Sequence, residues 1–426
     1  MKKIILFFPL FILAQNFDSL KNEIQNSLKY KIKEKQIEIY KQKVIQAKAL
    51  NVGKLNLEYN GAYFFEQPVM KLNTLEPVAI NNNQLVYKEI SSSLPMSEKK
   101  HFIGEIKYSY PIFNGFAITN IIKKANLNLI KQKLELKNLK RVLTIQIAQI
   151  YANIYALNQQ IKALNTQKEA ILNSKQKAEA LYNAELLDKS NLDEIDAKYF
   201  ETIASIQNIK SQQKSLLETL SYIINKQINK IDSIYISHKN FKPNFLKRSD
   251  VKAIKQTLKI ANVDIQIAKS KLYPFINFAV ALKKEADTAL LNRNDYQNID
   301  KSYAGISITY NIFDGGEIKS KIEMAKIAKI ENQLFFNDYL KQIKTEYSNL
   351  LNQYNALFYQ LNSAKKEIKA RESYYEYIKA KFDEGFADVS DLTTALAKLT
   401  SSKAKKEIIK SQIFFIEKQL ELNKGE

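Results

Sequence analysis

Side chains that could carry out chemistry are few in this chain and form no known catalytic pattern. The sequence has no Cys and only two His, His101 and His238, which lie far apart in predicted loops. Without Cys there is no disulfide, thiolate metal site or lipid-modified N-terminal Cys. No Gly-rich phosphate loop, Gly-x-Ser-x-Gly turn or His-Glu-x-x-His helix occurs. We therefore expect no enzyme activity, no cofactor and no metal.

The acidic and hydroxyl residues that recur at fixed spacing suit helix capping. Asp188-x-Ser190-x-Leu192 recurs as Asp388-x-Ser390-x-Leu392. Asp and Ser side chains accept hydrogen bonds from the free N–H groups at a helix start. Gly385 suits a left-handed C-cap of the preceding helix. The pattern predicts two turns between helices, at 185–191 and 385–391, although Glu185 in place of Gly leaves the shape of the first turn open.

The elements that must position these turns repeat along the chain. Tyr110-Pro-Ile-Phe-Asn-Gly115 recurs 200 positions later as Tyr310-Asn-Ile-Phe-Asp-Gly315, and the same shift holds for about a hundred residues. A constant spacing over that length indicates two copies of one structural unit. We predict a first repeat at 15–229 and a second at 230–426. Each repeat would contain a helix, a strand pair (about 53–114 and about 274–314) and a helical hairpin.

Long helices follow from the placement of Gly and Pro. Neither residue occurs between Gly115 and Pro243, or between Gly316 and Gly385. A helix over Phe116–Leu187, about seventy residues, would be roughly 100 Å long. Its apolar residues recur every three or four positions, which is typical of a helix that packs laterally in coiled-coil style. We expect its return partner over about Leu192–Asn229.

Four short windows alternate between apolar and polar residues as strands do. Each belongs to a run of about ten residues, the length of a tilted transmembrane β-strand, and has one apolar or aromatic face. A half-buried sheet of a soluble protein would show the same alternation. Two loops, Glu66–Phe102 and Glu285–Ser302, are expected between paired strands. The windows are Leu55–Tyr63, Ile106–Ile112, Ile276–Leu282 and Ile306–Ile312.

The N-terminus predicts export. Met1-Lys-Lys3 is a short positive segment, Ile4–Leu13 is apolar, and Ala14 precedes the polar chain that begins at Gln15. The apolar run is too short to span a bilayer as a helix, so we interpret 1–14 as a signal peptide. A buried N-terminal strand is the alternative. No later stretch offers about 18 consecutive apolar residues, so no transmembrane helix is expected.

The net charge of +21 does not indicate nucleic-acid binding. Only four of the 65 basic residues are Arg, the side chain that makes bidentate contacts with phosphate and guanine. The Lys residues are distributed among Glu, Gln and Asn along the predicted helices, as on solvated helical faces. We expect no nucleic-acid partner.

The sequence resembles the TolC-type outer-membrane efflux family over nearly the whole mature chain. The two Tyr-x-Ile-Phe-Asn/Asp-Gly motifs, each followed by a long helix, carry the resemblance. A second motif is Phe-x-x-Gly-x-x-x-x-x-Asp-Leu at Phe382–Leu392, with a degenerate copy at Tyr182–Leu192. A third is the run into a strand at Ala268–Pro274, echoed at Ala47–Gly53.

The resemblance implies a mainly α fold with a small β part. Very long antiparallel helical hairpins would form an α-barrel tunnel in the periplasm. Four strands cannot close a barrel, because about eight is the practical minimum, and open edges are not tolerated in lipid. Family members are trimers, so three chains would share one twelve-stranded transmembrane β-barrel. The implied partners are a homotrimer, outer-membrane lipid, a periplasmic adaptor (membrane fusion) protein and an inner-membrane pump.

The function implied by the resemblance is a passive exit duct in the outer membrane. It would belong to a tripartite efflux or a type I secretion system, and the sequence leaves both open. A periplasmic adaptor would need a Gly-rich lipoyl-like β-domain, which is not visible. A soluble or exported coiled-coil scaffold would explain the helices but not the signal peptide or the four strand windows.

The resemblance also implies site residues at the helical turns. Asp391 matches a position that carries a constriction-lining Asp in relatives, and Thr394 stands where the family often has a second acid. Asn191 and Glu194 are their equivalents in the first repeat. The alternative for Asp391 is a favourable interaction with the dipole of its own helix start. Candidates for adaptor docking are Leu186, Leu187, Phe386 and Ala387, and the strand-to-helix turn would use Gly115, Asp314 and Gly315.

Overall fold

The computed structural model describes residues 15–81, 83–96, 98–185, 187–291 and 301–425. The predicted signal peptide, 1–14, lies outside these residues. The chain divides into two compact units that both draw on the two halves of the sequence. The helical unit contains residues up to Ile39, Ile130–Thr257 and Asn332–Glu426, and the sheet unit contains Tyr40–Leu129 and Leu258–Glu331. Each is described by itself.

The predicted long helices are confirmed. The helices α3 and α6 each have 67 residues, and both their ends are 200 positions apart. Their partners α4 and α7 begin 200 positions apart as well. No helix among the described residues is long and apolar enough to cross a membrane. The α-helices are α1 Phe17–Glu23, α2 Leu28–Ala49, α3 Ala117–Asn183, α4 Lys189–Ile224, α5 Ser249–Lys269, α6 Glu317–Asp383 and α7 Val389–Asn423, with short 3-10 turns η1 Ile24–Asn26, η2 Phe245–Lys247 and η3 Ser270–Leu272.

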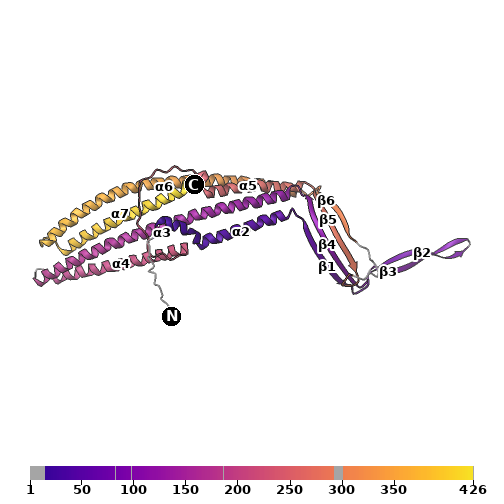
Figure 1. Cartoon of the computed structure of the whole chain (residues 1–426), viewed down its shortest axis with the longest axis horizontal. Coiled ribbons are helices and arrows are strands. Elements are labelled where there is room, and N and C mark those ends of the chain that lie inside the picture. The colour runs from indigo at the N-terminus through magenta and orange to yellow at the C-terminus, as the bar shows by residue number, and fades with distance from the viewer. Residues whose placement is uncertain (1–14, 82, 97, 186, 292–300, 426) are drawn as a thin grey trace, which may run out of the picture. The chain divides into compact units, whose positions relative to one another are not determined.

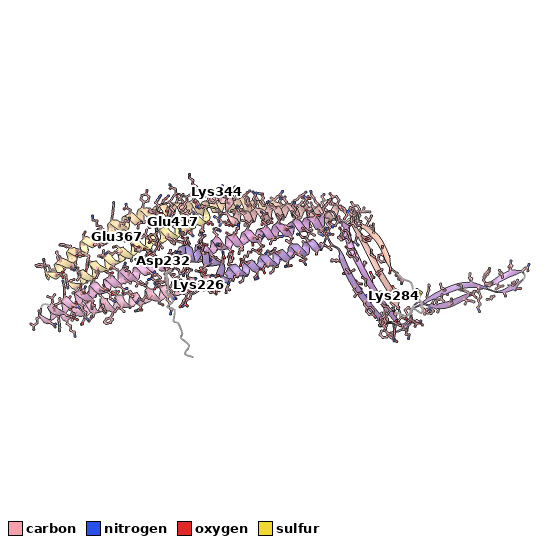
Figure 2. The ribbon with its side chains drawn as sticks, in the orientation of Figure 1. Lys226, Asp232, Lys284, Lys344, Glu367 and Glu417 are labelled. Atoms are coloured by element: carbon pink, nitrogen blue, oxygen red, sulfur yellow. The ribbon has the colours of Figure 1, made fainter. Side chains whose placement is uncertain are left out.

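The helical unit packs α4 and α7 alongside the distal parts of α3 and α6 (Figure 1). Tyr151 of α3 is 1% exposed and contacts Phe17 of α1 and Phe414 of α7. The Tyr151 hydroxyl donates to the carbonyl oxygen of Asp232 at 2.9 Å (Asp232 is labelled in Figure 2). Gln15 forms a parallel bridge with Ile231 beside it. The start of the described chain is therefore fixed to the core of this unit.

The sheet unit contains the four predicted strands in one antiparallel sheet of order β1-β4-β5-β6. These strands are β1 Lys54–Tyr63, β4 Lys100–Phe113, β5 Phe275–Ala286 and β6 Tyr303–Thr309. The last strand ends earlier than expected, so Tyr310 and Ile312 lie beyond it. Within this sheet β1 and β6 each have a neighbour on one side only.

We predicted a loop over Glu66–Phe102. This prediction was wrong, because the segment contains a second, two-stranded sheet. The strands β2 (Val69–Asn81) and β3 (Gln84–Pro95) pair antiparallel over almost their full length. The register shifts between Pro77 and Ala79, so the proline, which has no N–H to donate, lies at an irregularity of the ladder. Asn83 has a left-handed φ of 61° at the turn. Turn-forming residues here mark a hairpin end, not an irregular loop.

The histidines also depart partly from expectation. His101 lies in β4 opposite Ala62, not in a loop, and its ring is tilted against Phe64. His238 lies in an extended segment of the helical unit and packs against the rings of Tyr354 and Phe358. Among the described residues, no group of three or more His, Asp and Glu side chains is placed to hold a metal ion.

Candidate functional site

The turn between α6 and α7 has the predicted capping residues. Gly385 has a φ of 80°, which only Gly adopts without strain. Asp388 is the N-cap of α7, and its carboxylate accepts a hydrogen bond from the Asp391 N–H at 2.8 Å. Ser390 lies inside the helix, so its expected capping role was wrong. The cap orients the first turn of α7, which carries Asp391.

The turn between α3 and α4 has a left-handed residue at the same position, although that residue is not Gly. Glu185 takes a left-handed φ of 61° at the position equivalent to Gly385. Such a conformation is unfavourable for a side chain with a Cβ by about 1 kcal/mol. Asp188 is the N-cap of α4 but makes no side-chain capping bond, and Ser190 again lies inside the helix. The two turns thus share a left-handed residue at the same position and differ in capping.

The pore candidates lie in the first turns of α4 and α7. Asp391 is exposed, while Asn191 and Glu194 are half-buried. Hydrogen bonding to Tyr377, chiefly, and the negative charge of Asp391 raise the pKa of Lys381, so Asp391 has a cation within electrostatic range. Thr394 is exposed, and lines a crevice of about 160 Å³ formed by α3, α4 and α7.

An apolar cluster holds the two tips together. It contains buried residues of all four long helices, among them Ile171 of α3, Ile195 of α4, Phe382 of α6 and Leu392 of α7. Two ion pairs flank it. Lys175 Nζ lies 2.5 Å from Asp196 Oδ1, and Lys177 Nζ lies 2.5 Å from Asp383 Oδ1, which links α3 to α6. The two turns are therefore held within one packed structure.

The docking candidates differ in their accessibility. Phe386 is 77% exposed, although a phenyl ring is normally buried. Leu187 and Ala387 pack against the tip cluster and are only half-exposed. Leu186 lies outside the described residues. Of the three described candidates, Phe386 presents the clearest apolar surface to a partner.

The two strand-to-helix turns have glycines of similar conformation but differ in how tightly they are packed. Gly115 has a φ of 63°, and a Cβ there would lie 2.3 Å from the carbonyl oxygen of Ser270. Gly315 has a similar φ of 65° but faces open space. The Asp314 carboxylate accepts from the N–H groups of Gly316 at 2.9 Å and Ile318 at 2.7 Å, and these bonds lower its pKa. Asp314 is therefore the side-chain cap at the start of α6.

The four-stranded sheet is apolar on its more exposed side. Leu57 of β1 is 75% exposed and Leu282 of β5 is 61% exposed. They lie on one face, because both are in register with Ile106 of β4. On the other face Ala281 is fully buried and Glu285 is 7% exposed. This is the reverse of a soluble sheet, whose apolar side faces the core.

Charges on the polar side of the sheet are paired with one another. Glu285 Oε1 lies 2.9 Å from Lys283 Nζ, and Glu285 Oε2 lies 2.7 Å from Lys301 Nζ. Glu105 is the cross-strand neighbour of Lys283. Lys284, labelled in Figure 2, is the next residue along β5 and therefore belongs to the opposite face.

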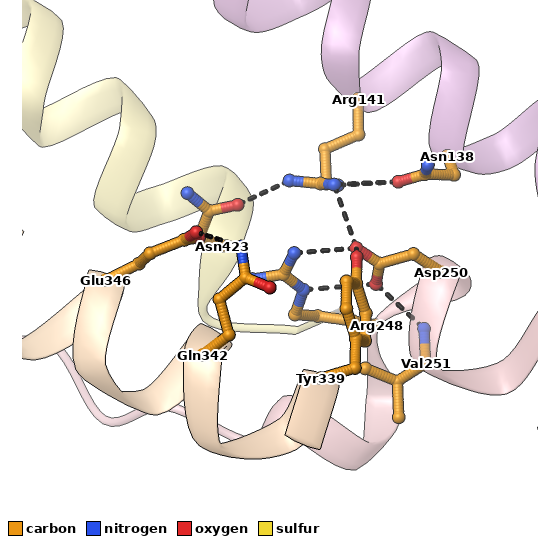
Figure 3. A network of polar contacts seen from close by, with 9 residues as sticks. All are labelled: Asn138, Arg141, Arg248, Asp250, Val251, Tyr339, Gln342, Glu346 and Asn423. Carbon is orange, nitrogen blue, oxygen red and sulfur yellow. Dashed lines mark hydrogen bonds and ion pairs between the residues drawn. The ribbon is translucent and has the colours of Figure 1, made fainter. Parts of the chain in front are cut away.

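A buried polar network was not anticipated from the sequence (Figure 3). Asp250 Oδ2 lies 2.6 Å from Arg248 Nη2 and 3.0 Å from Arg141 Nη2, and accepts from the Tyr339 hydroxyl at 2.9 Å. Arg141 also bonds Asn423 near the end of α7. The network joins α3, α5, α6 and α7 in one place. The signal that could have found it is the rarity of Arg in a chain whose other cations are nearly all Lys.

The ionisation states of this network follow from its geometry. Burial alone would raise the pKa of Asp250, but Arg248 and Arg141 outweigh it and the pKa is lowered. Burial and the Asp250 charge raise the pKa of Tyr339 to about 12. At neutral pH the carboxylate is charged and the phenol is a donor. Nothing in this arrangement presents a reactive group to a substrate, because Arg248 and Asp250 are both only 6% exposed.

Comparisons with known proteins agree with this geometry. Residues 246–421 match the family described as outer membrane efflux protein, which confirms the resemblance seen in the sequence. No curated protein sequence matches the chain significantly.

Several solved structures share the fold. The outer membrane protein VceC of Vibrio cholerae superimposes with a TM-score of 0.73 at 16% identity, covering 96% of each chain. The CmeC outer membrane channel of Campylobacter jejuni gives 0.76 at 15% identity, over 96% of this chain and 86% of that one. The MtrE outer membrane channel of Neisseria gonorrhoeae gives 0.71 at 15%, over 95% and 88%.

The two strand-to-helix glycines provide a matched test. Gly315→Ala should lower the free energy of unfolding by about 1 kcal/mol, because only the left-handed φ is strained. Gly115→Ala should cost at least about 2 kcal/mol more, because its Cβ would also meet the Ser270 carbonyl oxygen. Denaturant unfolding of the two purified variants measures the difference. Equal destabilisation would show that the close approach at Gly115 does not exist.

Proposed function

We propose that this chain, which matches the outer membrane efflux protein family over residues 246–421, forms the outer-membrane exit duct of a tripartite efflux or type I secretion system. The duct is a passive channel through which small molecules or proteins leave the cell. It lies in the outer membrane, and its helical unit belongs to the periplasm. The lack of a catalytic motif in the sequence agrees with this role, because a channel acts through its charge and shape and needs no reactive groups.

The observation that carries the proposal is the reversed polarity of the four-stranded sheet. On its apolar side Leu57 and Leu282 are more than half exposed, while Leu291 lies over Gly104 at one end of that side. Apolar surface of this extent is favourable in lipid and unfavourable in water. Its polar side carries Glu105, Lys283 and Glu285, as a water-filled lumen requires. A soluble scaffold or a periplasmic adaptor would have no use for this arrangement.

The number of strands supports association of several copies. The edges β1 and β6 leave backbone N–H and C=O groups without partners, which hydrocarbon does not tolerate. Four strands are too few to close on themselves. Three copies, with β6 of one beside β1 of the next, would give a closed twelve-stranded barrel, in keeping with the trimers of the family.

The helical tips are the proposed docking end for a periplasmic adaptor and, through it, an inner-membrane pump. Phe386 is the proposed anchor, because it is the most exposed of the described apolar tip candidates. Leu187 and Ala387 support it from the tip cluster. Asp391 is the proposed pore acid, and Asn191, Glu194 and Thr394 are the further pore candidates, in the first two turns of α4 and α7.

Assembly in the membrane tests the proposal directly. Mild-detergent extracts of outer membrane should contain a particle near three times the 49.2 kDa chain, less its signal peptide. The mature chain should begin near Gln15, which terminal sequencing of the particle would show. Size-exclusion chromatography with light scattering gives the mass. A monodisperse monomer in the soluble fraction would reject the proposal.

The role of Asp391 is tested in planar bilayers. Three Asp391 carboxylates converging at a narrow tip would attract cations, in a field that a narrow pore screens poorly. Asp391→Asn should therefore lower cation selectivity and weaken block by multivalent cations, with folding nearly unchanged at this exposed position.

Asp388→Asn is the matched control, because it removes a charge from the same turn and keeps a capping oxygen. It should leave selectivity unchanged and alter stability by about 1 kcal/mol or less. If Asp388→Asn changes selectivity or block while Asp391→Asn does not, the pore acid has been misassigned.

A further inference from the structure

Within one chain, α7 lies in the groove between α3 and α4. The Tyr155 hydroxyl of α3 donates to Glu407 Oε2 of α7 at 2.7 Å, and Tyr151 packs against Phe414 with ring centroids 5.7 Å apart. Nearer the tip, Ile171 of α3 lines a crevice together with Thr393 of α7 and residues of α4. Residues from the same three helices line a second groove of about 640 Å³. The first repeat therefore offers a groove, and the second repeat fills it with its returning helix.

The same two surfaces exist again in the chain, and among the described residues no helix pairs with either of them. The 200-residue shift relates α4 to α7, and it relates α6 to α3. On α4, Phe200 is 65% exposed, whereas its equivalent on α7, Thr400, is buried. Asp193 and Gln207 of α4 are exposed too, and Asn355 of α6 is exposed. Within the part of the chain that the structure describes, α4 fills no groove and the groove between α6 and α7 holds no helix.

We propose that α4 of one copy packs into the groove between α6 and α7 of the next copy, as α7 packs between α3 and α4 within a chain. The inference rests on the proposed function, since it assumes that several copies assemble, and it names the surface by which their helical units meet. The contact is head-to-tail, because the two surfaces differ. Such an interface repeats around a ring until the ring closes.

The residues that this packing would bring together are complementary. The shift of 200 positions places Arg371 of α6 where α3 has Ile171. It places Asp193 of α4 where α7 has Thr393. Among the described residues neither Arg371 nor Asp193 forms an ion pair within the chain. Arg371 is the sole Arg in the long helices besides Arg141, which belongs to the buried network. An ion pair between the Arg371 guanidinium and the Asp193 carboxylate of a second copy accounts for an Arg at this position.

A second pair is matched in polarity. Tyr155 of α3 and Glu407 of α7 form a hydrogen bond within the chain. The equivalent positions are Asn355 of α6 and Gln207 of α4. Two side-chain amides can donate to and accept from one another, so the contact keeps a hydrogen bond without a charge. One contact would join two acids, because Glu367 of α6 (labelled in Figure 2) would lie near Glu194 of the next copy, and Lys405, 3.0 Å from Glu367, would offset their repulsion. The candidate Glu194 would then belong to the interface and not to the pore.

Thiol cross-linking tests the interface, and the chain is suited to it because it has no Cys of its own. Asn355→Cys combined with Gln207→Cys should, with a short bismaleimide, give covalent dimers and trimers on denaturing gels of membrane extracts. Each single variant should give monomers. Tyr155→Cys combined with Glu407→Cys is the matched control, because the same reagent should link it within one chain and leave the mass unchanged.

Charge exchange tests the proposed ion pair. Asp193→Arg and Arg371→Asp should each cause loss of the native trimer band, since each places like charges together. The double variant Asp193→Arg/Arg371→Asp should restore the band. A trimeric particle in which the Asn355 and Gln207 cysteines do not link and the double variant gives no rescue would overturn this interface and leave the proposed function standing. Monomers alone, in the unmodified protein, would overturn both.

Discussion

Unpaired backbone at the edges of a small sheet is the constraint on which the rest of this structure depends. The strands β1 and β6 each pair on one side only, and the apolar side of their sheet is exposed. In water such a sheet would expose both open edges and a hydrophobic surface, which favours aggregation. In lipid the surface is stabilised, but the edges must be closed by strands from other copies. The proposed association and the proposed membrane location therefore rest on one feature.

The internal repeat explains how long helices can serve such an assembly. A helix of 67 residues exposes far more side chain than one chain can bury, so it is stable only beside similar helices. The internal repeat places two pairs of similar long helices in each chain. It also supplies the surfaces by which copies meet, because each groove and each returning helix exists in two versions. Sequence differences between the versions, such as Ile171 against Arg371, then separate contacts within a chain from contacts between chains.

Much of the fold could be predicted from the sequence because its signals are local. The absence of Gly and Pro predicted α3 and α6 nearly to their ends, and Asp388 and Gly385 predicted the second tip. Alternation predicted the four main strands. The hairpin β2–β3 was missed because Pro77 and the Asn-rich turn are typical of loops, and only the paired strands around them show a sheet.

The candidate site was predicted less well because its contacts are distant in sequence. The Asp250 network joins residues from Asn138 to Asn423, and no spacing rule connects them. Glu185 gave no indication that it would take a left-handed conformation. The sequence placed Leu187 and Ala387 at a tip surface, but the tip cluster that partly buries them depends on two hairpins meeting.

The central claim is that the apolar side of the sheet faces lipid, and a scan along β5 tests it most directly. Ala279, Val280, Ala281 and Leu282 would be replaced singly by Cys and labelled with a polarity-sensitive fluorophore in the membrane-inserted protein. Labels at 280 and 282 should be quenched by a lipid-soluble quencher, and labels at 279 and 281 by a water-soluble one. A pattern without alternation, or the reverse pattern, would contradict the account.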